Sequence, residues 1–197
     1  MNLPKNISSF FIIIIGDTHG YMDDFKIQKE VIGKVKPDYV LYEQMNNKRL
    51  IKKADFLVIL QKKSISIMTE VGEVKHLIKL CMKKGLPLIG IDFKNFGIGW
   101  ARKFKFKLDN NHEFTAKEKQ CLDIIYKKRE QHQLKTIRKY AKKGKILVIT
   151  GSHHLRQKSP LIKGISHFLA ILPYYNGKPA FGPVANKRGL KYRVITK

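Results

Sequence analysis

Short apolar runs alternate with longer amphipathic segments along this chain of 197 residues. Four of the runs have the length and apolar character of strands buried in a parallel sheet, and the first of them is unbroken and rich in β-branched residues. They lie at residues 10–15, 38–43, 86–91 and 145–150. Three longer segments repeat apolar side chains at near-helical spacing, and they predict helices at residues 21–36, 70–84 and 115–143. This alternation predicts an α/β fold whose sheet is mixed, mainly parallel and flanked by helices.

The remaining segments have weaker patterns. Residues 44–63 fit one continuous helix or a helix followed by a strand, and we favour the continuous helix. Residues 93–111 are irregular, glycine-rich and aromatic, which predicts a flap over a site. Residues 165–172 and 190–196 predict two further strands, the second of them at an edge of the sheet.

Length and cysteine content bound the class of protein. A chain of this size without a low-complexity linker predicts a single domain over residues 1–197, with a core of about 10–156 and a looser C-terminal extension at 157–197. Cys81 and Cys121 lack the spacing of a zinc knuckle and make no disulfide framework, so a reduced, cytoplasmic protein is the simpler interpretation. The longest apolar run, of about six residues, is too short for a transmembrane segment.

The composition is strongly basic. The chain has 40 Lys and Arg against 15 Asp and Glu, a formal net charge of +25, which favours weak, nonspecific binding to polyanions. Arginine binds phosphates and bases bidentately, yet most of the basic residues are lysines spread over every segment. A solvated, compositionally biased surface is therefore favoured over dedicated nucleic-acid recognition. The substrate, a small molecule or a peptide, and the oligomeric state do not follow from the sequence.

Two of the predicted strands end in the same Gly-x-x-His pattern, Gly16 with His19 and Gly151 with His154. Ligands of open α/β sheets bind beyond the carboxyl ends of the strands, which right-handed crossovers place at one edge. His153 is interpreted as incidental, because the repeated spacing selects its neighbour. We call the carboxyl end of a strand, with the residues that follow it, its exit. The exits of the four strands carry Asp17 with His19, Glu43, Asp92, and His153 with His154. The sequence therefore predicts that these side chains meet in one pocket.

The long helix at residues 115–143 is predicted to add an arginine to this pocket. Its 3.6-residue periodicity places Arg129 and Gln133 on the inward-facing stripe. The structural alternative is an arginine that snorkels to the rim. Histidines, carboxylates and an inward arginine are the groups needed to bind a divalent metal such as Mn, Co or Zn, or to activate a water molecule.

Each candidate also has a purely structural interpretation. His19 and His154 fit buried histidines whose hydrogen bonds are satisfied, and Asp17 fits a cap of the following helix or loop. Glu43 fits an exposed carboxylate at the end of a strand. Asp92 fits the first residue of a turn.

Four ordered motifs carry a resemblance to the TraB/PrgY, GumN, TIKI and erythromycin-esterase/ChaN-like superfamily. In that superfamily a first strand ends in Gly-x-x-His, a second reads PD-x-V-x-x-E, a helix carries Arg beside an acid or amide, and a late strand ends in Gly-x-x-His-Leu. The matching segments here are Gly16 to His19, residues 37–43 (P-D-Y-V-L-Y-E), Arg129-Glu130, and Gly151 to Leu155. They cover about residues 10–156 in the right order.

The resemblance implies an erythromycin-esterase/ChaN-like core and a hydrolase that acts on a peptide, ester or related acyl bond. TIKI members are metal-dependent proteases, erythromycin esterases open a lactone with a histidine, and ChaN-like proteins bind haem. For this chain it implies that His19, Glu43 and His154 hold a divalent metal or polarise a water directly. Without a metal, Glu43 is the expected general base and His19 the alternative. Arg129 would stabilise the oxyanion or orient Glu43, and Asp17 would orient a histidine.

Some of the same residues also resemble the motifs of a second family. Residues 17–20 (D-T-H-G) match the first motif of calcineurin-like metallophosphoesterases, and residues 111–113 (N-H-E) resemble their Asn-His-Asp/Glu motif. That chemistry needs a second Gly-Asp at the exit of strand two, to bridge two metals about 3.5–4 Å apart. Asp38 lies at the entrance of that strand and Glu43 at its exit. A metallophosphoesterase and a non-catalytic basic ligand- or nucleic-acid-binding protein therefore remain the alternatives.

Overall fold

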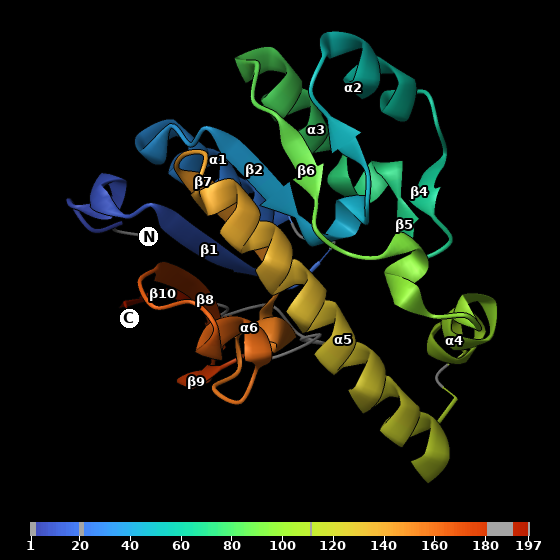
Figure 1. Ribbon diagram of the computed structural model, residues 1–197. Coiled ribbons are helices and arrows are strands. Elements are labelled where there is room, and N and C mark those ends of the chain that lie inside the picture. The colour runs from blue at the N-terminus through green and yellow to red at the C-terminus, as the bar shows by residue number, and fades with distance from the viewer. Residues whose placement is uncertain (1–2, 20–21, 111, 181–190, 197) are drawn as a thin grey trace.

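A mixed sheet forms the centre of the protein (Figure 1). The computed structural model describes residues 3–19, 22–110, 112–180 and 191–196. In sheet order the strands are β10 (Lys191–Thr196), β8 (Leu169–Tyr175), β1 (Ile12–Asp17), β7 (Ile146–Gly151), β2 (Tyr39–Tyr42), β6 (Leu88–Gly90) and β3 (Arg49–Leu50), and β9 (Lys178–Pro179) pairs with β8. The five strands from β8 to β6 are parallel, and β10, β9 and β3 pair antiparallel. The predicted α/β fold with a mainly parallel mixed sheet is confirmed.

The central strands are apolar throughout because both faces of the sheet are covered. On β1, Ile13 and Ile15 pack with α1 (Met22–Val35), α2 (Lys53–Leu60) and α3 (Val71–Lys84) in one apolar cluster. Ile14 points to the other face and packs in a second cluster with α5 (Ala116–Ala141) and α6 (Pro160–Lys163). Alternation of side chains along a strand requires this division.

The register of the sheet brings the strand exits together. Asp17 at the end of β1 pairs with Gly151 at the end of β7, and Tyr42 at the end of β2 pairs with both Ile149 and Gly90. The 3-10 helices η2 (Glu43–Met45), η3 (Lys94–Gly97) and η4 (Ser152–Leu155) follow three of these exits. The remaining elements are η1 (Ile7–Ser9), the hairpin of β4 (Ser64–Ser66) and β5 (Thr69–Glu70), and α4 (Ala101–Asp109).

The continuous helix expected at residues 44–63 is wrong. The chain turns at Asn46, whose φ is 53°, and forms the short antiparallel strand β3 before α2. The Asp55 carboxylate accepts the backbone N–H groups of Ile51 and Lys52, which fixes the start of α2 at Lys53. Local apolar periodicity misses this arrangement because the strand is stabilised by pairing with β6.

Two other weakly patterned regions also contain regular elements. The segment 93–111, expected to be irregular, contains η3 and α4. In the C-terminal segment 157–197, the strand predicted at 165–172 is present as β8, which begins and ends later, at Leu169 and Tyr175, and lies directly beside β1. The predicted edge strand at 190–196 is present as β10. Four end positions of expected elements lie outside the described residues. They are residue 20 of the loop after the first strand, residue 21 of the first helix, residue 111 of the flap and residue 190 of the edge strand.

None of the helices in the described part of the chain combines the length and the apolar character that a membrane span requires. The longest, α5, carries a charged or polar residue in every turn along its length. This agrees with the short apolar runs of the sequence.

Candidate functional site

A cavity of about 460 Å³ lies where the exits of β1, β2 and β7 meet one face of α5. Five side chains that the sequence predicted for the site line it, namely Asp17, His19, Glu43, Arg129 and His154. His153, interpreted from the sequence as incidental, lines the same cavity. The structure therefore brings residues from distant parts of the chain into one pocket.

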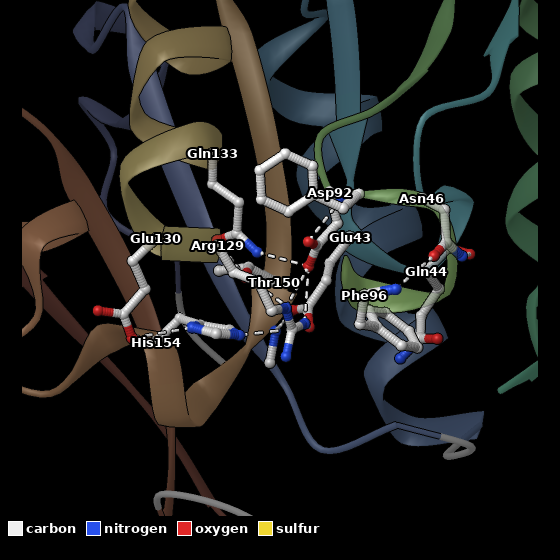
Figure 2. Close-up of polar contacts among 12 residues, drawn as sticks. Glu43, Gln44, Asn46, Asp92, Phe96, Arg129, Glu130, Gln133, Thr150 and His154 are labelled. Atoms are coloured by element: carbon white, nitrogen blue, oxygen red, sulfur yellow. Dashed lines mark hydrogen bonds and ion pairs between the residues drawn. The ribbon is translucent and has the colours of Figure 1, made fainter. Parts of the chain in front are cut away.

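Glu43, the first residue of η2, is buried and fully hydrogen-bonded (Figure 2). Its Oε1 accepts from Nη2 of Arg129 at 2.6 Å and lies 3.3 Å from Nε2 of His154. Its Oε2 accepts from Oγ1 of Thr150 at 2.8 Å and from the N–H of Gly151 at 2.5 Å. Burial raises the pKa of this carboxyl, but His154 and Arg129 outweigh burial and hold the pKa well below its usual value. An ionised carboxylate has about four acceptor positions, so this geometry does not favour Glu43 as a general base.

Arg129 links that carboxylate to a second one at the exit of β6. Its Nε and Nη2 donate to Oδ2 of Asp92 at 2.9 and 2.7 Å, and Nε2 of Gln133 donates to the same oxygen at 3.0 Å. The guanidinium also lies over the rings of Phe96 and Tyr126, 4.7 and 5.4 Å from their centroids. Arg129 is 6% exposed. The inward position that helical periodicity predicts for Arg129 and Gln133 is therefore confirmed, and snorkelling to the rim is not observed.

His154 lies between two carboxylates. Its Nδ1 is 3.0 Å from Oε1 of Glu130, and its Nε2 is 3.3 Å from Oε1 of Glu43. Burial lowers the pKa of the ring, but the two carboxylates outweigh it and the pKa is raised. Facing an acceptor on each side, both ring nitrogens act as donors, as in an imidazolium.

Glu130 and Arg156 complete this part of the site. Nη1 of Arg156 donates to Oε1 of Glu130 at 2.5 Å. The Oε2 atom of Glu130 is buried without a hydrogen-bond partner. Sequence reasoning did not select either residue for the site. The signals were the place of Glu130 beside Arg129 in the third motif and of Arg156 just after the second Gly-x-x-His.

His19 is half-buried, with 38% of its side chain exposed. Its Nδ1 lies 3.0 Å from Nε2 of Gln44 and 3.5 Å from Oδ2 of Asp17. Its Nε2 faces Gly151, and a Cβ added to that glycine would lie only 2.9 Å from this nitrogen. Burial lowers the pKa of the ring, but the charge and hydrogen bond of Asp17 raise it to about 9. In the neutral ring, a hydrogen bond donated by Gln44 to Nδ1 would leave the proton on Nε2.

Asp17 holds the loop that carries His19. Its Oδ1 accepts the backbone N–H of His19 at 2.8 Å, and its Oδ2 accepts the hydroxyl of Tyr42 at 3.1 Å. Burial would raise the pKa of this carboxyl, but the neighbouring His19 lowers it to about 2. Asp17 therefore stabilises the loop and orients the histidine. The structural interpretation, a cap of the loop, and the functional one, a residue that orients a histidine, describe the same contacts.

Asp24 on α1 forms a buried polar cluster behind the loop. Its Oδ2 accepts the backbone N–H and the hydroxyl of Thr18 at 3.0 and 2.7 Å, and its Oδ1 accepts the hydroxyl of Tyr192 from β10. Burial and the neighbouring Asp17 raise the pKa of Asp24 to about 7.

As the pH rises from about 4 to 7, we expect stability to fall less, or to rise more, in Asp24→Asn than in the wild type. The folded-state pKa of Asp24 is raised to about 7, whereas an unfolded Asp has a pKa of about 3.9. The folded state therefore binds this proton more tightly, and its contribution to the free energy of unfolding falls as the pH rises through this window. Urea unfolding at a series of pH values measures the slope. Asp23→Asn, at an exposed neighbour, is the control, and an unchanged slope in Asp24→Asn would contradict the expectation.

The three residues predicted to hold a metal do not fit one in this arrangement. Within the described residues, no group of three or more His, Cys, Asp and Glu side chains is arranged to hold a metal ion. His154 directs both nitrogens at carboxylates, and both oxygens of Glu43 accept hydrogen bonds. A metal ligand needs a free lone pair, and of the three only His19 has a nitrogen facing the cavity.

The residues of the phosphoesterase alternative lie away from this cavity. Oδ2 of Asp38 accepts the backbone N–H of Lys145 at 2.7 Å, at the amino ends of β2 and β7 and so at the opposite end of these strands from the cavity. His112 and Glu113 are exposed, and Asn111 lies outside the described residues. The placement of Asp38 does not favour a dinuclear metal centre at the cavity.

Comparison with known proteins gives no relative. No protein-family model, no curated protein and no solved structure matches this chain.

Proposed function

We propose that this protein is a TraB/TIKI-like hydrolase that acts on a peptide, ester or related acyl bond. The observation that carries the proposal is the shared cavity: the histidines of the two Gly-x-x-His motifs line it together with Glu43 and Arg129. The order of these motifs along the chain is the order in the TraB/PrgY, GumN, TIKI and erythromycin-esterase/ChaN-like superfamily. The α/β core with a mainly parallel sheet agrees with that assignment.

The buried charges give further support. Removing ionised groups from water costs free energy, whereas burying apolar side chains of similar volume does not. Buried ion pairs therefore add little net stability. This protein nevertheless buries Glu43, Arg129, Glu130 and His154 at one sheet edge beside a cavity. Charges fixed in a site that excludes water are suited to stabilising charge that develops during a reaction.

The chemistry we propose uses two histidines of the cavity. His19 presents its Nε2 proton and polarises the acyl carbonyl. A water oxygen then bonds to the acyl carbon, and the water proton passes to His153. The bond to the leaving oxygen or nitrogen breaks as that atom takes the proton from His153, which regenerates the free imidazole. Glu43, held by Arg129, provides the negative charge that positions His154 and the exit of β7.

His153 is chosen as the base because its surroundings keep it neutral. It is half-buried in the cavity wall, with its ring 5.3 Å from that of Tyr126. Burial first, then the charges of Arg156 and His154, lower its pKa. A neutral imidazole can accept a proton at neutral pH, whereas the His19 ring, with its pKa of about 9, is suited to donating one.

We expect His19→Gln and His153→Gln each to lower kcat/KM about a hundredfold on p-nitrophenyl butyrate, an activated acyl ester, because general acid and base groups contribute on that order or more. His76→Gln, at an exposed position on α3, is the matched control and should keep full activity. Turnover should persist in a chelator. Wild-type protein with no acyl hydrolysis on esters or peptides would reject the proposal, and activity that a chelator removes and Mn, Co or Zn restores would reject the metal-free chemistry.

A further inference from the structure

One wall of the cavity, beside the charged residues that form its floor, is apolar. We call it the apolar wall, and it consists of Phe96, Ile98, Phe104, Leu108, Leu122 and Ile125. These side chains come from η3 and the residue after it, Ile98, from α4 and from the first half of α5, where α4 lies beside the end of α5 that extends beyond the sheet (Figure 1). Four of them are buried together in a small cluster that is separate from the two clusters that cover the sheet. The apolar wall therefore belongs to the cavity and not to the main core.

The cations at the floor of the cavity are already paired. Arg129 contacts Glu43, His154 lies between two carboxylates, and His19 lies 3.5 Å from Asp17. A phosphate or carboxylate ligand would have to compete with these partners or approach them closely. The net charge of +25 is thus a property of the surface, and the cavity itself does not favour an anion.

We propose that the substrate is a neutral ester, lactone or amide that carries an extended apolar group. The carbonyl would lie at the floor, beside Nε2 of His19, and the apolar group would pack along the wall towards Leu108, which is 48% exposed at the outer end. This inference rests on the proposed function and names its substrate class. Each methylene group buried against the wall should tighten binding about fourfold.

Chain-length series test the proposal by turnover and by binding. Hydrolysis of p-nitrophenyl acetate, butyrate and octanoate gives kcat/KM, which we expect to rise at least about tenfold from acetate to octanoate. Binding is measured by calorimetry with 2-butanone and 2-octanone, which carry a carbonyl but no scissile bond, and with octanoate as the anionic counterpart of equal length. We expect 2-octanone to bind more than about tenfold tighter than 2-butanone, and more tightly than octanoate.

Two neighbouring isoleucines on α5 provide matched variants. Ile125 lines the cavity, whereas Ile124 points about 100° away around the helix, is 50% exposed and does not line it. Ile125→Ser should reduce the octanoate-to-acetate ratio of kcat/KM, and the affinity for 2-octanone, by about fivefold or more. Ile124→Ser should change neither. Because Ile125 lies outside the main core, the variant should fold, which circular dichroism checks.

The outcomes separate the two proposals. Ester hydrolysis without dependence on chain length, or octanoate binding more tightly than 2-octanone, would overturn the apolar substrate class and leave the hydrolase intact. If no ester or amide is hydrolysed, the proposed function fails. In that case tight 2-octanone binding weakened by Ile125→Ser would still support a neutral apolar carbonyl compound as the occupant of the cavity, and weak binding would overturn it.

Discussion

Replacing Arg129 with methionine is expected to lower the free energy of unfolding by about 3–5 kcal/mol, because it leaves two buried carboxylates without their shared cation. Arg129 donates to Oε1 of Glu43 at 2.6 Å and to Oδ2 of Asp92 at 2.7 and 2.9 Å, and all three side chains are almost completely buried. Methionine fills much of the same space, so lost charge and hydrogen bonds cause the effect. Urea unfolding followed by circular dichroism measures it.

Two further variants show whether the effect comes from the uncompensated charges. Lys128→Met removes a positive charge from the exposed neighbour on the same helix and should change stability by less than about 0.5 kcal/mol. Asp92→Asn added to Arg129→Met removes one of the two orphaned carboxylates, so the double variant should recover part of the loss. A loss of less than 1 kcal/mol in Arg129→Met, or a double variant that is less stable than the single one, would contradict the buried network.

Replacing Gly90 with alanine is the second change for which we expect a large effect, a loss of about 3 kcal/mol in the free energy of unfolding. Gly90 ends β6, and its N–H donates to the carbonyl of Lys48 at 2.6 Å. An added Cβ would overlap the backbone carbonyl of Asn46 and lie 2.8 Å from the amide nitrogen of Lys48. Backbone atoms cannot move aside as a side-chain end can. The chain after η2 would therefore have to shift, and Glu43 at the start of η2 would shift with it.

A glycine on a helix provides the matched control. An added Cβ on Gly33 of α1 meets nothing within 4 Å. Gly33→Ala should therefore raise stability by about 0.5–1 kcal/mol, since alanine restricts the unfolded chain and favours the helix. Thermal and urea unfolding of both variants give the comparison. If Gly90→Ala were as stable as the wild type, the close approach of β6 and the turn at Asn46 would be refuted.

Two sequence-based expectations about partners and chemistry stay predictions. The surface charge of +25 predicts weak polyanion binding, which leaves a non-catalytic nucleic-acid-binding protein as an alternative. Such binding would fall steeply with salt and would not depend on His19 or His153. The predicted Mn, Co or Zn is not favoured at His154 and Glu43, whose hydrogen-bonding atoms already have partners.

The sequence by itself determined the class of fold and the edge of the sheet where the site lies. Unbroken apolar runs identify strands buried on both faces, and the residue after each run lies at the carboxyl end of its strand, so Asp17 and Glu43 were placed correctly without knowledge of any contact. The helical period of 3.6 likewise placed Arg129 and Gln133 on the buried side of α5. These patterns are local, and a local pattern can be read along the chain.

Only the tertiary structure decided how those groups pair. The Glu130–His154 contact, the four hydrogen-bonding partners of Glu43 and the approach of Asn46 to Gly90 join segments far apart in the chain. The position of β8 beside β1, which gives the C-terminal segment its place in the sheet, is of the same kind. Such contacts depend on the lateral order of the strands, and no periodicity along the chain encodes that order, because it is set by which packed arrangement buries the apolar faces and satisfies the buried polar groups together.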